Sequence, residues 1–207
     1  MKSVFFNGAK LLTGLLVVML STAVSADSKL EPTWVKEGAN WEKYNRFLIR
    51  PLEIEDVAVV RPPWAEDDPH EWTLQIESLQ GIQAIFRDTM NQTLSANDGY
   101  DVVYSPGPDV LEVEVEILSI MPWVRPGSGN SVDGMTVTTL GSGEMTASVE
   151  LRDSMTRELL LLIEGDKAVG EQYQEFTQAN NVANIENMFT AFAKRLRMAM
   201  DRVHGKN

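Results

Sequence analysis

The feature that most constrains the fold is a strict apolar alternation in the middle of the chain. Within Asp109 to Ile120 the alternate positions Leu111, Val113, Val115 and Ile117 are apolar, whereas Glu112, Glu114 and Glu116 occupy the positions between them. Successive side chains of a β-strand point to opposite faces, so the pattern predicts a strand with one buried and one solvated face, the latter with basic partners on neighbouring strands. Glu144 to Arg152 repeats it. The predicted buried positions are Leu111, Val113, Val115, Ile117, Met145, Ala147, Val149 and Leu151.

Three further segments complete the predicted sheet. Glu158 to Glu164 is rich in leucine and is predicted to be a central antiparallel strand. Arg46 to Glu55 is typical of a first strand, in which Pro51 favours an edge or a bulge. Tyr100 to Tyr104 predicts a short strand after the turn signal at residues 97–99.

Two segments have the apolar periodicity of amphipathic helices. The first is expected from Pro69 to about Thr93 and the second from Val182 to Val203. Their apolar faces are Trp72, Ile76, Leu79, Ile82, Phe86 and Met90, and Ile185, Phe189, Phe192, Leu196, Ala199 and Val203. We therefore predict an α+β fold, with a single mainly antiparallel sheet of about five strands and both helices packed on one face.

The segment Asp153–Glu158 carries several reactive side chains between two predicted strands. A serine nucleophile at Ser154 would need a nearby histidine as base, and the only histidines are His70 and His204, at a predicted helix start and in the C-terminal tail. Asp and Ser also initiate turns by bonding to their own backbone. We interpret the segment as a hairpin turn.

The densest group of possible metal ligands is Asp67, Asp68, His70 and Glu71. The same residues suit a helix start, because Asp68 can cap it, Pro69 fits the first position and Glu71 lies three residues after the cap. The spacing is not specific for a metal, so we predict capping, no metal site and no cofactor. Together with the flat carboxylate row at Glu112, Glu114 and Glu116, this predicts a protein that is not an enzyme.

The N-terminal 26 residues have the layout of a secretory signal peptide, with Lys2 and Lys10 followed by an apolar run and small residues. We expect cleavage between Ala26 and Asp27, then an N-terminal arm (27–45) and a single α+β domain (46–207). The chain contains no cysteine, which rules out a lipid-bearing cysteine and predicts a periplasmic protein without a transmembrane span after cleavage. The net charge of −12 argues against nucleic acid as a partner.

Contacts with a partner are expected at aromatic residues beside flexible polar segments. Residues 122–143 are rich in Gly, Ser and Thr and form either a binding loop or only a mobile hairpin. Trp123 and Arg125 lie at its start, and the N-terminal arm carries Trp34 and Trp41. We predict these four residues as candidate binding residues.

Three segments together resemble a family of bacterial secreted proteins catalogued as domain of unknown function 3313. They are YDVVY (100–104) with PGPDVLEVEV (106–115), ASVELRDSMTRELL (147–160) and FAKRLR (192–197). The resemblance extends from about Trp34 to Arg202 and implies an envelope protein, often a lipoprotein, without an established activity. The chain departs from the family by lacking the lipid-bearing cysteine and by carrying Arg157 where a turn glycine is usual.

These observations favour a non-enzymatic periplasmic binding or assembly module whose partner is an envelope protein. Two other functions stay open. One is a metal-dependent or acid/base hydrolase that uses an acidic cluster. The other is a carrier of a lipid or small apolar ligand, with the ligand between helix and sheet.

Overall fold

The main sheet is built around three long strands that form a meander. The computed structural model describes residues 31–128, 131–132 and 135–206. β5 (Val110–Pro122), β9 (Gly143–Asp153) and β10 (Leu159–Val169) pair antiparallel in the order β10-β9-β5. All eight predicted core positions on β5 and β9 are buried, which confirms the alternation.

The edges of the sheet differ from the prediction of about five mainly antiparallel strands. The sheet has seven strands in the order β1-β10-β9-β5-β2-β4, with β3 paired to β5. β1 (Pro32–Val35) is antiparallel to β10, whereas β2 (Arg46–Ile49) is parallel to both β4 (Asp101–Val102) and β5, and β3 (Ala58–Val59) is parallel to β5. The sheet is therefore mixed, because the chain between β2 and β5 crosses over through a helix, as parallel strands require.

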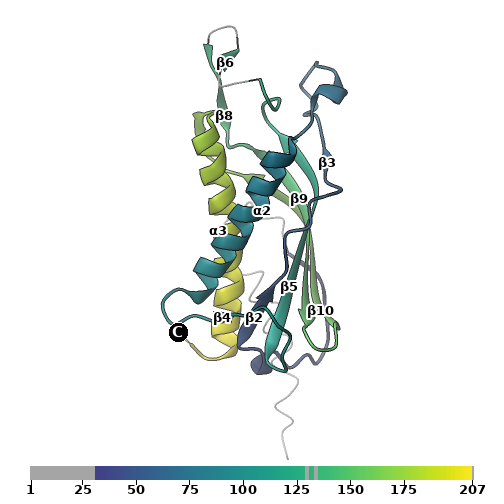
Figure 1. Cartoon of the computed structure of the whole chain (residues 1–207), viewed down its shortest axis with the longest axis vertical. Helices are drawn as coiled ribbons and strands as arrows, with labels where there is room; N and C mark the ends of the chain where they lie inside the picture. Colours follow the sequence, from purple (N-terminus) through teal and green to yellow (C-terminus); the bar gives the residue numbers. More distant parts are fainter. Residues whose placement is uncertain (1–30, 129–130, 133–134, 207) are drawn as a thin grey trace, which may run out of the picture.

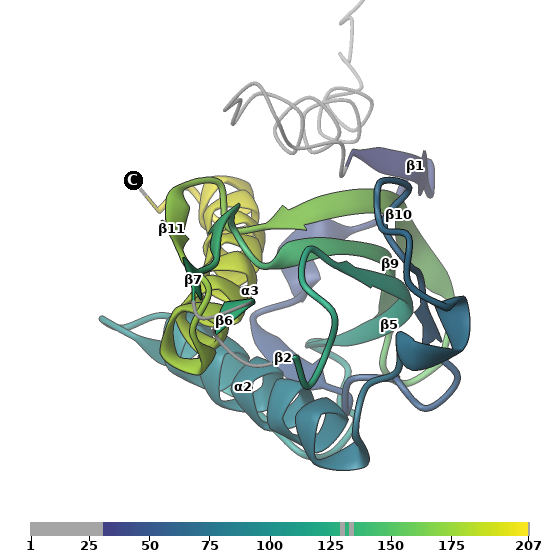
Figure 2. The same cartoon turned by 90° about the horizontal axis from the view of Figure 1, so that it is seen from above.

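Both long helices lie on the same side of the curved sheet (Figures 1 and 2). α2 (Ile76–Ser95) and α3 (Gln178–Val203) pack against each other, with the rings of Phe86 and Phe189 edge to face at 5.1 Å between centroids. The α+β class and the two helices are confirmed. α3 begins four residues earlier than predicted, because the Thr177 hydroxyl accepts a hydrogen bond from the Asn180 N–H and caps the helix there.

The predicted start of the first helix is wrong. Asp68 caps only a single turn of 3-10 helix, η3 (Pro69–Glu71), where its carboxylate accepts from the His70 N–H at 2.9 Å. The chain then extends, and α2 starts at Ile76, whose side chain is largely exposed. Trp72 is buried as predicted, but it lies in the segment that precedes α2 and not on the apolar face of the helix.

The segment predicted as an arm contributes to the sheet and to the core. β1 extends the sheet beyond β10, and Trp41, in the 3-10 helix η2 (Trp41–Lys43), is buried together with Tyr44. The predicted signal peptide and the cleavage point between Ala26 and Asp27 lie outside the described residues.

Four short strands lie beyond the end of the meander that is at the top in Figure 1, which we call the upper end. β8 (Thr138–Leu140) pairs with β11 (Tyr173–Glu175), and β6 (Ser131–Val132) pairs with β7 (Met135–Thr136). Gly141 and Gly170 pass so close that a Cβ at Gly141 would lie 2.2 Å from the Gly170 carbonyl oxygen, and both have left-handed φ angles. The close approach attaches the small β8–β11 sheet to the ends of β9 and β10.

Candidate functional site

The turn between β9 and β10 is held together by Asp153. Its buried carboxylate accepts hydrogen bonds from Lys43 Nζ (2.6 Å), Tyr44 Oη (2.9 Å) and the backbone N–H groups of Met155 and Thr156. Burial by itself raises the pKa of Asp153, but the hydrogen bonds from Lys43, Thr156 and Tyr44 outweigh it and hold the pKa below its usual range. The turn prediction is confirmed, and the network also ties the N-terminal segment to the hairpin.

Ser154 and Arg157 also serve this turn. The buried Ser154 hydroxyl accepts from the Gly107 N–H and donates to the Gly107 carbonyl, at 3.1 and 3.0 Å. Arg157 has a φ of +62°, a left-handed conformation that explains why glycine suits this position. His204 lies elsewhere, with its ring nitrogens near the Tyr100 hydroxyl and the Glu42 carbonyl.

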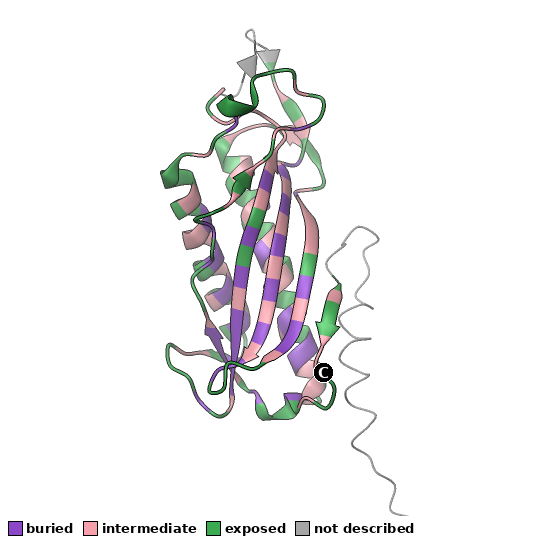
Figure 3. Cartoon of the chain, turned by 90° about the vertical axis from the view of Figure 1, so that its right-hand side faces the viewer, coloured by how far each residue is buried: buried purple, intermediate pink, exposed green. Residues whose placement is uncertain are grey.

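The carboxylate row on the outer face of β5 is not uniformly solvated, contrary to the prediction (Figure 3). Glu112 is fully buried between Arg50 and Arg157, and its Oε2 has no hydrogen-bond partner. Glu114 pairs with Arg152 and Arg157, so the expected basic partners on neighbouring strands are present. The two arginine side chains cover Glu112 while remaining about half exposed themselves.

We expect Glu112→Met to change the free energy of unfolding by less than about 1 kcal/mol, or to raise it. Burying a charged carboxylate is costly, and an apolar side chain of similar volume removes that cost, while the half-exposed Arg50 and Arg157 can be hydrated. Urea denaturation of both proteins at pH 7 measures the difference. A loss above about 3 kcal/mol would mean that this ion pair stabilises the sheet strongly.

The residues of the acidic group near η3 contact the chain itself. Asp68 caps η3, and Glu71 forms an ion pair with Arg125 from the segment that follows β5. In the part of the chain that the structure describes, no three or more His, Asp or Glu side chains gather as a metal site would require. Asp67 contributes its backbone carbonyl to Arg61 at 2.6 Å.

An exposed aromatic group lies at the upper end of the molecule. The Trp64 ring packs against Trp123, with 5.1 Å between ring centroids, and the Trp123 Nε1–H donates to the Leu140 carbonyl at 2.8 Å. Leu140 is paired across β8 and β11 with Tyr173. Trp64, Leu140 and Tyr173 are 63%, 46% and 79% exposed. We call Trp64, Trp123, Leu140 and Tyr173 the distal aromatic surface.

Polar contacts connect the segments that carry the distal aromatic surface to α3 and to the chain near η3. The Ser142 hydroxyl donates to Asn181 Oδ1 at 2.7 Å and accepts from Asn184 Nδ2 at 2.8 Å, which connects the start of β9 to the first turns of α3. Asn184 is buried. The ion pair of Arg125 with Glu71 joins the Trp123 segment to the chain around Trp64. These contacts connect the distal aromatic surface to β9 and α3, two of the long elements of the fold.

The four predicted binding residues are not brought together. Trp123 and Arg125 belong to the upper end, where β10 ends at Val169. Trp34 pairs in β1 with Leu162 of β10, seven residues before that end. That offset corresponds to roughly 23 Å along a strand. Trp34 is 44% exposed, but Trp41 is only 4% exposed and cannot contact a partner in this structure. Trp64 was not predicted, because it stands in a proline-rich segment without periodicity.

A second feature is an apolar cavity of about 80 Å³ between α3 and the inner face of β5, β9 and β10. Sequence patterns predict which faces meet but not how completely side chains fill the space between them, so the cavity could not be predicted. Among the helices of residues 31–206 that the structure describes, none is long and apolar enough to cross a membrane.

Comparisons with solved structures found similar chains at low identity. A PelC dodecamer from Paraburkholderia phytofirmans is 9% identical, with 81% of this chain and 96% of that chain covered and a TM-score of 0.39. A hypothetical protein from Chlamydia trachomatis is 12% identical, with coverages of 79% and 97% and a TM-score of 0.34. Among curated proteins, none matches the chain.

The comparison with protein families gave a match over most of the chain. The matching family model covers residues 17–196, which include the first two segments that carry the resemblance and all but the last residue of the third. The chain belongs to the family described as "Protein of unknown function (DUF3313)".

Proposed function

We propose that this protein is a non-enzymatic binding module of the bacterial envelope that docks onto a partner protein through the distal aromatic surface. The observation that carries the proposal is the Trp64–Trp123 pair, in which Trp64 packs against the second ring and still leaves 63% of its surface exposed. Exposed aromatic side chains on a rigid support are the residues that contribute most to protein interfaces.

The surroundings of the pair support a protein partner. Leu140 and Tyr173 extend the apolar area beyond the two tryptophans, and contiguous exposed apolar area marks interaction sites on soluble proteins. The ion pair of Arg125 with Glu71 borders it, as polar groups border interfaces. An envelope location rests on the signal-peptide pattern of residues 1–26, and the lack of cysteine favours a form without a lipid anchor.

The contacts of the acidic residues favour binding over hydrolysis. Asp68, Glu71, Asp153 and Glu112 each bind groups of the same chain, through a cap, two ion pairs and a turn network. Carboxylates occupied in this way lack the open, convergent arrangement that a metal-dependent or acid/base hydrolase needs.

We expect Trp64→Ala to weaken capture of the partner about 30-fold, because an aromatic hot spot contributes about 2 kcal/mol. Crosslinking in cells, with a photoreactive residue at position 173, identifies the partner, and titration of the purified pair measures affinity. Trp34→Ala is the matched control, since it removes an exposed tryptophan from a different part of the sheet. If Trp34→Ala abolishes capture and Trp64→Ala does not, the proposed surface is wrong.

A further inference from the structure

The cavity under α3 has a direct origin in the sequence of the sheet. On the inner face of β9 and β10, Ala147 is paired with Gly165, so two small residues lie side by side where neighbouring positions carry larger ones. Ile117 of β5 is the next partner of Ala147. α3 crosses this region with Met188, Phe192 and Leu196 among the lining side chains. A helix cannot follow a local depression in the sheet, so space remains between the two layers.

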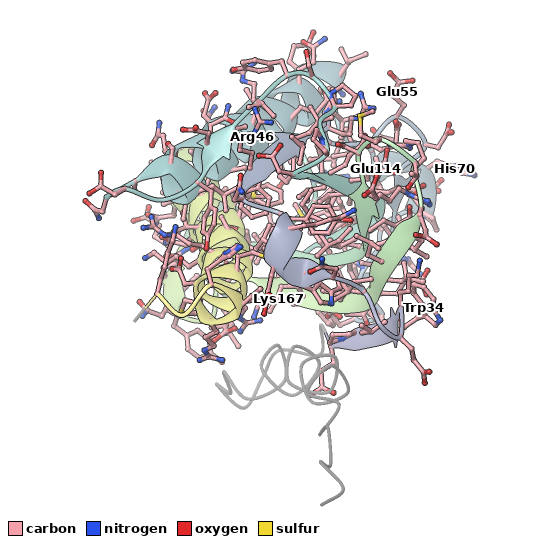
Figure 4. All side chains as sticks on the ribbon, turned by 90° about the horizontal axis from the view of Figure 1, so that it is seen from below. Trp34, Arg46, Glu55, His70, Glu114 and Lys167 are labelled. Carbon is pink, nitrogen blue, oxygen red and sulfur yellow. The ribbon has the colours of Figure 1, made fainter. Side chains whose placement is uncertain are left out.

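The lining is apolar except for two cationic residues. Lys167 and Arg195 are the only charged residues of the cavity wall, and both are basic. Lys167 is paired with the buried Met145, so it occupies an inward-facing position of β10, where a lysine is unusual. Its side chain is 16% exposed, and Figure 4 labels it beside α3. Arg195 faces the same space from α3 and is half-buried.

The ammonium group of Lys167 is available to an entering ligand. Its partner in the structure is Glu171, at 3.0 Å, and the Glu171 side chain is 50% exposed. An ion pair with such an exposed partner is weak and can exchange for another carboxylate. The aliphatic stem of Lys167 continues the apolar wall, so one residue supplies both an apolar contact and a positive charge.

We propose that the cavity binds a single-chain amphiphile with a carboxylate headgroup, such as a medium-chain fatty acid. The chain enters between α3 and β10 and packs against the apolar wall, and the carboxylate binds Lys167 and Arg195. Both side chains form charge-assisted hydrogen bonds with carboxylates, whereas a neutral headgroup gains only weaker hydrogen bonds from them and a cationic headgroup is repelled by both. This site is separate from the distal aromatic surface and does not depend on the proposed docking function.

The size of the cavity sets the chain length. At about 80 Å³ it is smaller than an apolar cavity of about 150 Å³ that accommodates benzene, so a short part of a chain fits without rearrangement. Met145 and Met188 line the space, and methionine side chains adopt alternative rotamers at low cost. Chains of medium length are therefore favoured over phospholipids with two long chains.

Isothermal titration of the purified protein with octanoate, at low ionic strength, tests the proposal. We expect octanoate to bind, with affinity reduced about tenfold in Lys167→Gln and in Arg195→Gln. Lys194→Gln is the matched control, because it removes the same charge from an exposed neighbouring position of α3. Ala147→Leu fills the cavity and is expected to abolish binding while the melting temperature is kept or raised.

Three comparison ligands separate the parts of the proposal. Octanol binding as tightly as octanoate, or equal losses in Lys194→Gln and Lys167→Gln, would overturn the role of the two cations. Octyl phosphate binding more than tenfold tighter than octanoate would overturn the carboxylate assignment. The site itself would be overturned if octanoate does not bind or if octyltrimethylammonium binds instead. Undiminished octanoate binding by a folded Ala147→Leu variant would have the same consequence.

The Trp64→Ala variant should bind octanoate normally, so the docking proposal can fail without affecting the proposal for the cavity.

Discussion

Asp153→Ala is expected to lower the free energy of unfolding by about 3 kcal/mol, because it removes a buried carboxylate on which several donors converge. Lys43, Tyr44 and Thr156 would all lose an acceptor, and the Tyr44 hydroxyl would remain buried without its partner. For a chain of this size the change corresponds to a melting temperature roughly 10 °C lower. Thermal denaturation followed by circular dichroism measures it.

The dependence on pH distinguishes the charge of Asp153 from its shape. The pKa of Asp153 is lower in the folded protein than its usual value near 4, so the stabilisation is present above about pH 4 and is lost as the pH falls further. Asp153→Asn keeps the size of the side chain without the charge. We expect the wild type to be more stable than this variant at pH 7 and the difference to shrink below pH 4. A constant difference from pH 7 to pH 2 would contradict the assignment.

Phe86→Ala is expected to cost about 4 kcal/mol, the usual effect of removing a fully buried aromatic side chain. Phe86 has no exposed surface and forms the edge-to-face contact with Phe189 that joins α2 to α3. Its loss leaves a void next to the ring that also lines the cavity under α3. Urea denaturation at pH 7 measures the change, which should appear as a lower midpoint.

The neighbouring residue provides the control for this variant. Arg87 follows Phe86 on α2, and its side chain is 65% exposed. Arg87→Ala should change the free energy of unfolding by less than about 0.5 kcal/mol, as is usual for surface positions. Equal losses in the two variants would show that the destabilisation comes from the helix itself and not from packing between α2 and α3.

Local patterns of the sequence determined the buried faces of the strands and the position of the hairpin turn. The alternation from Leu111 to Ile117 predicted the buried face of β5, and the pair Asp153–Ser154 predicted the turn, because both depend on backbone geometry over a few residues. The predicted strand Glu158–Glu164 is too short, because β10 continues to Val169. Extending the alternation through Leu161, Ile163 and Gly165 would have placed Lys167 on the inner face and given an early signal of a charged wall.

Contacts between distant segments decided the rest. Glu112 follows the polar alternation and is nevertheless buried, because Arg50 and Arg157, 62 residues before and 45 after it, cover it from neighbouring segments. Trp41, predicted to contact a partner, is buried, because η2 packs against α3 from the other end of the chain. Periodicity specifies which face of an element is apolar, but the partner of that face, the direction of pairing and any space left between layers arise only when elements far apart in the sequence pack together.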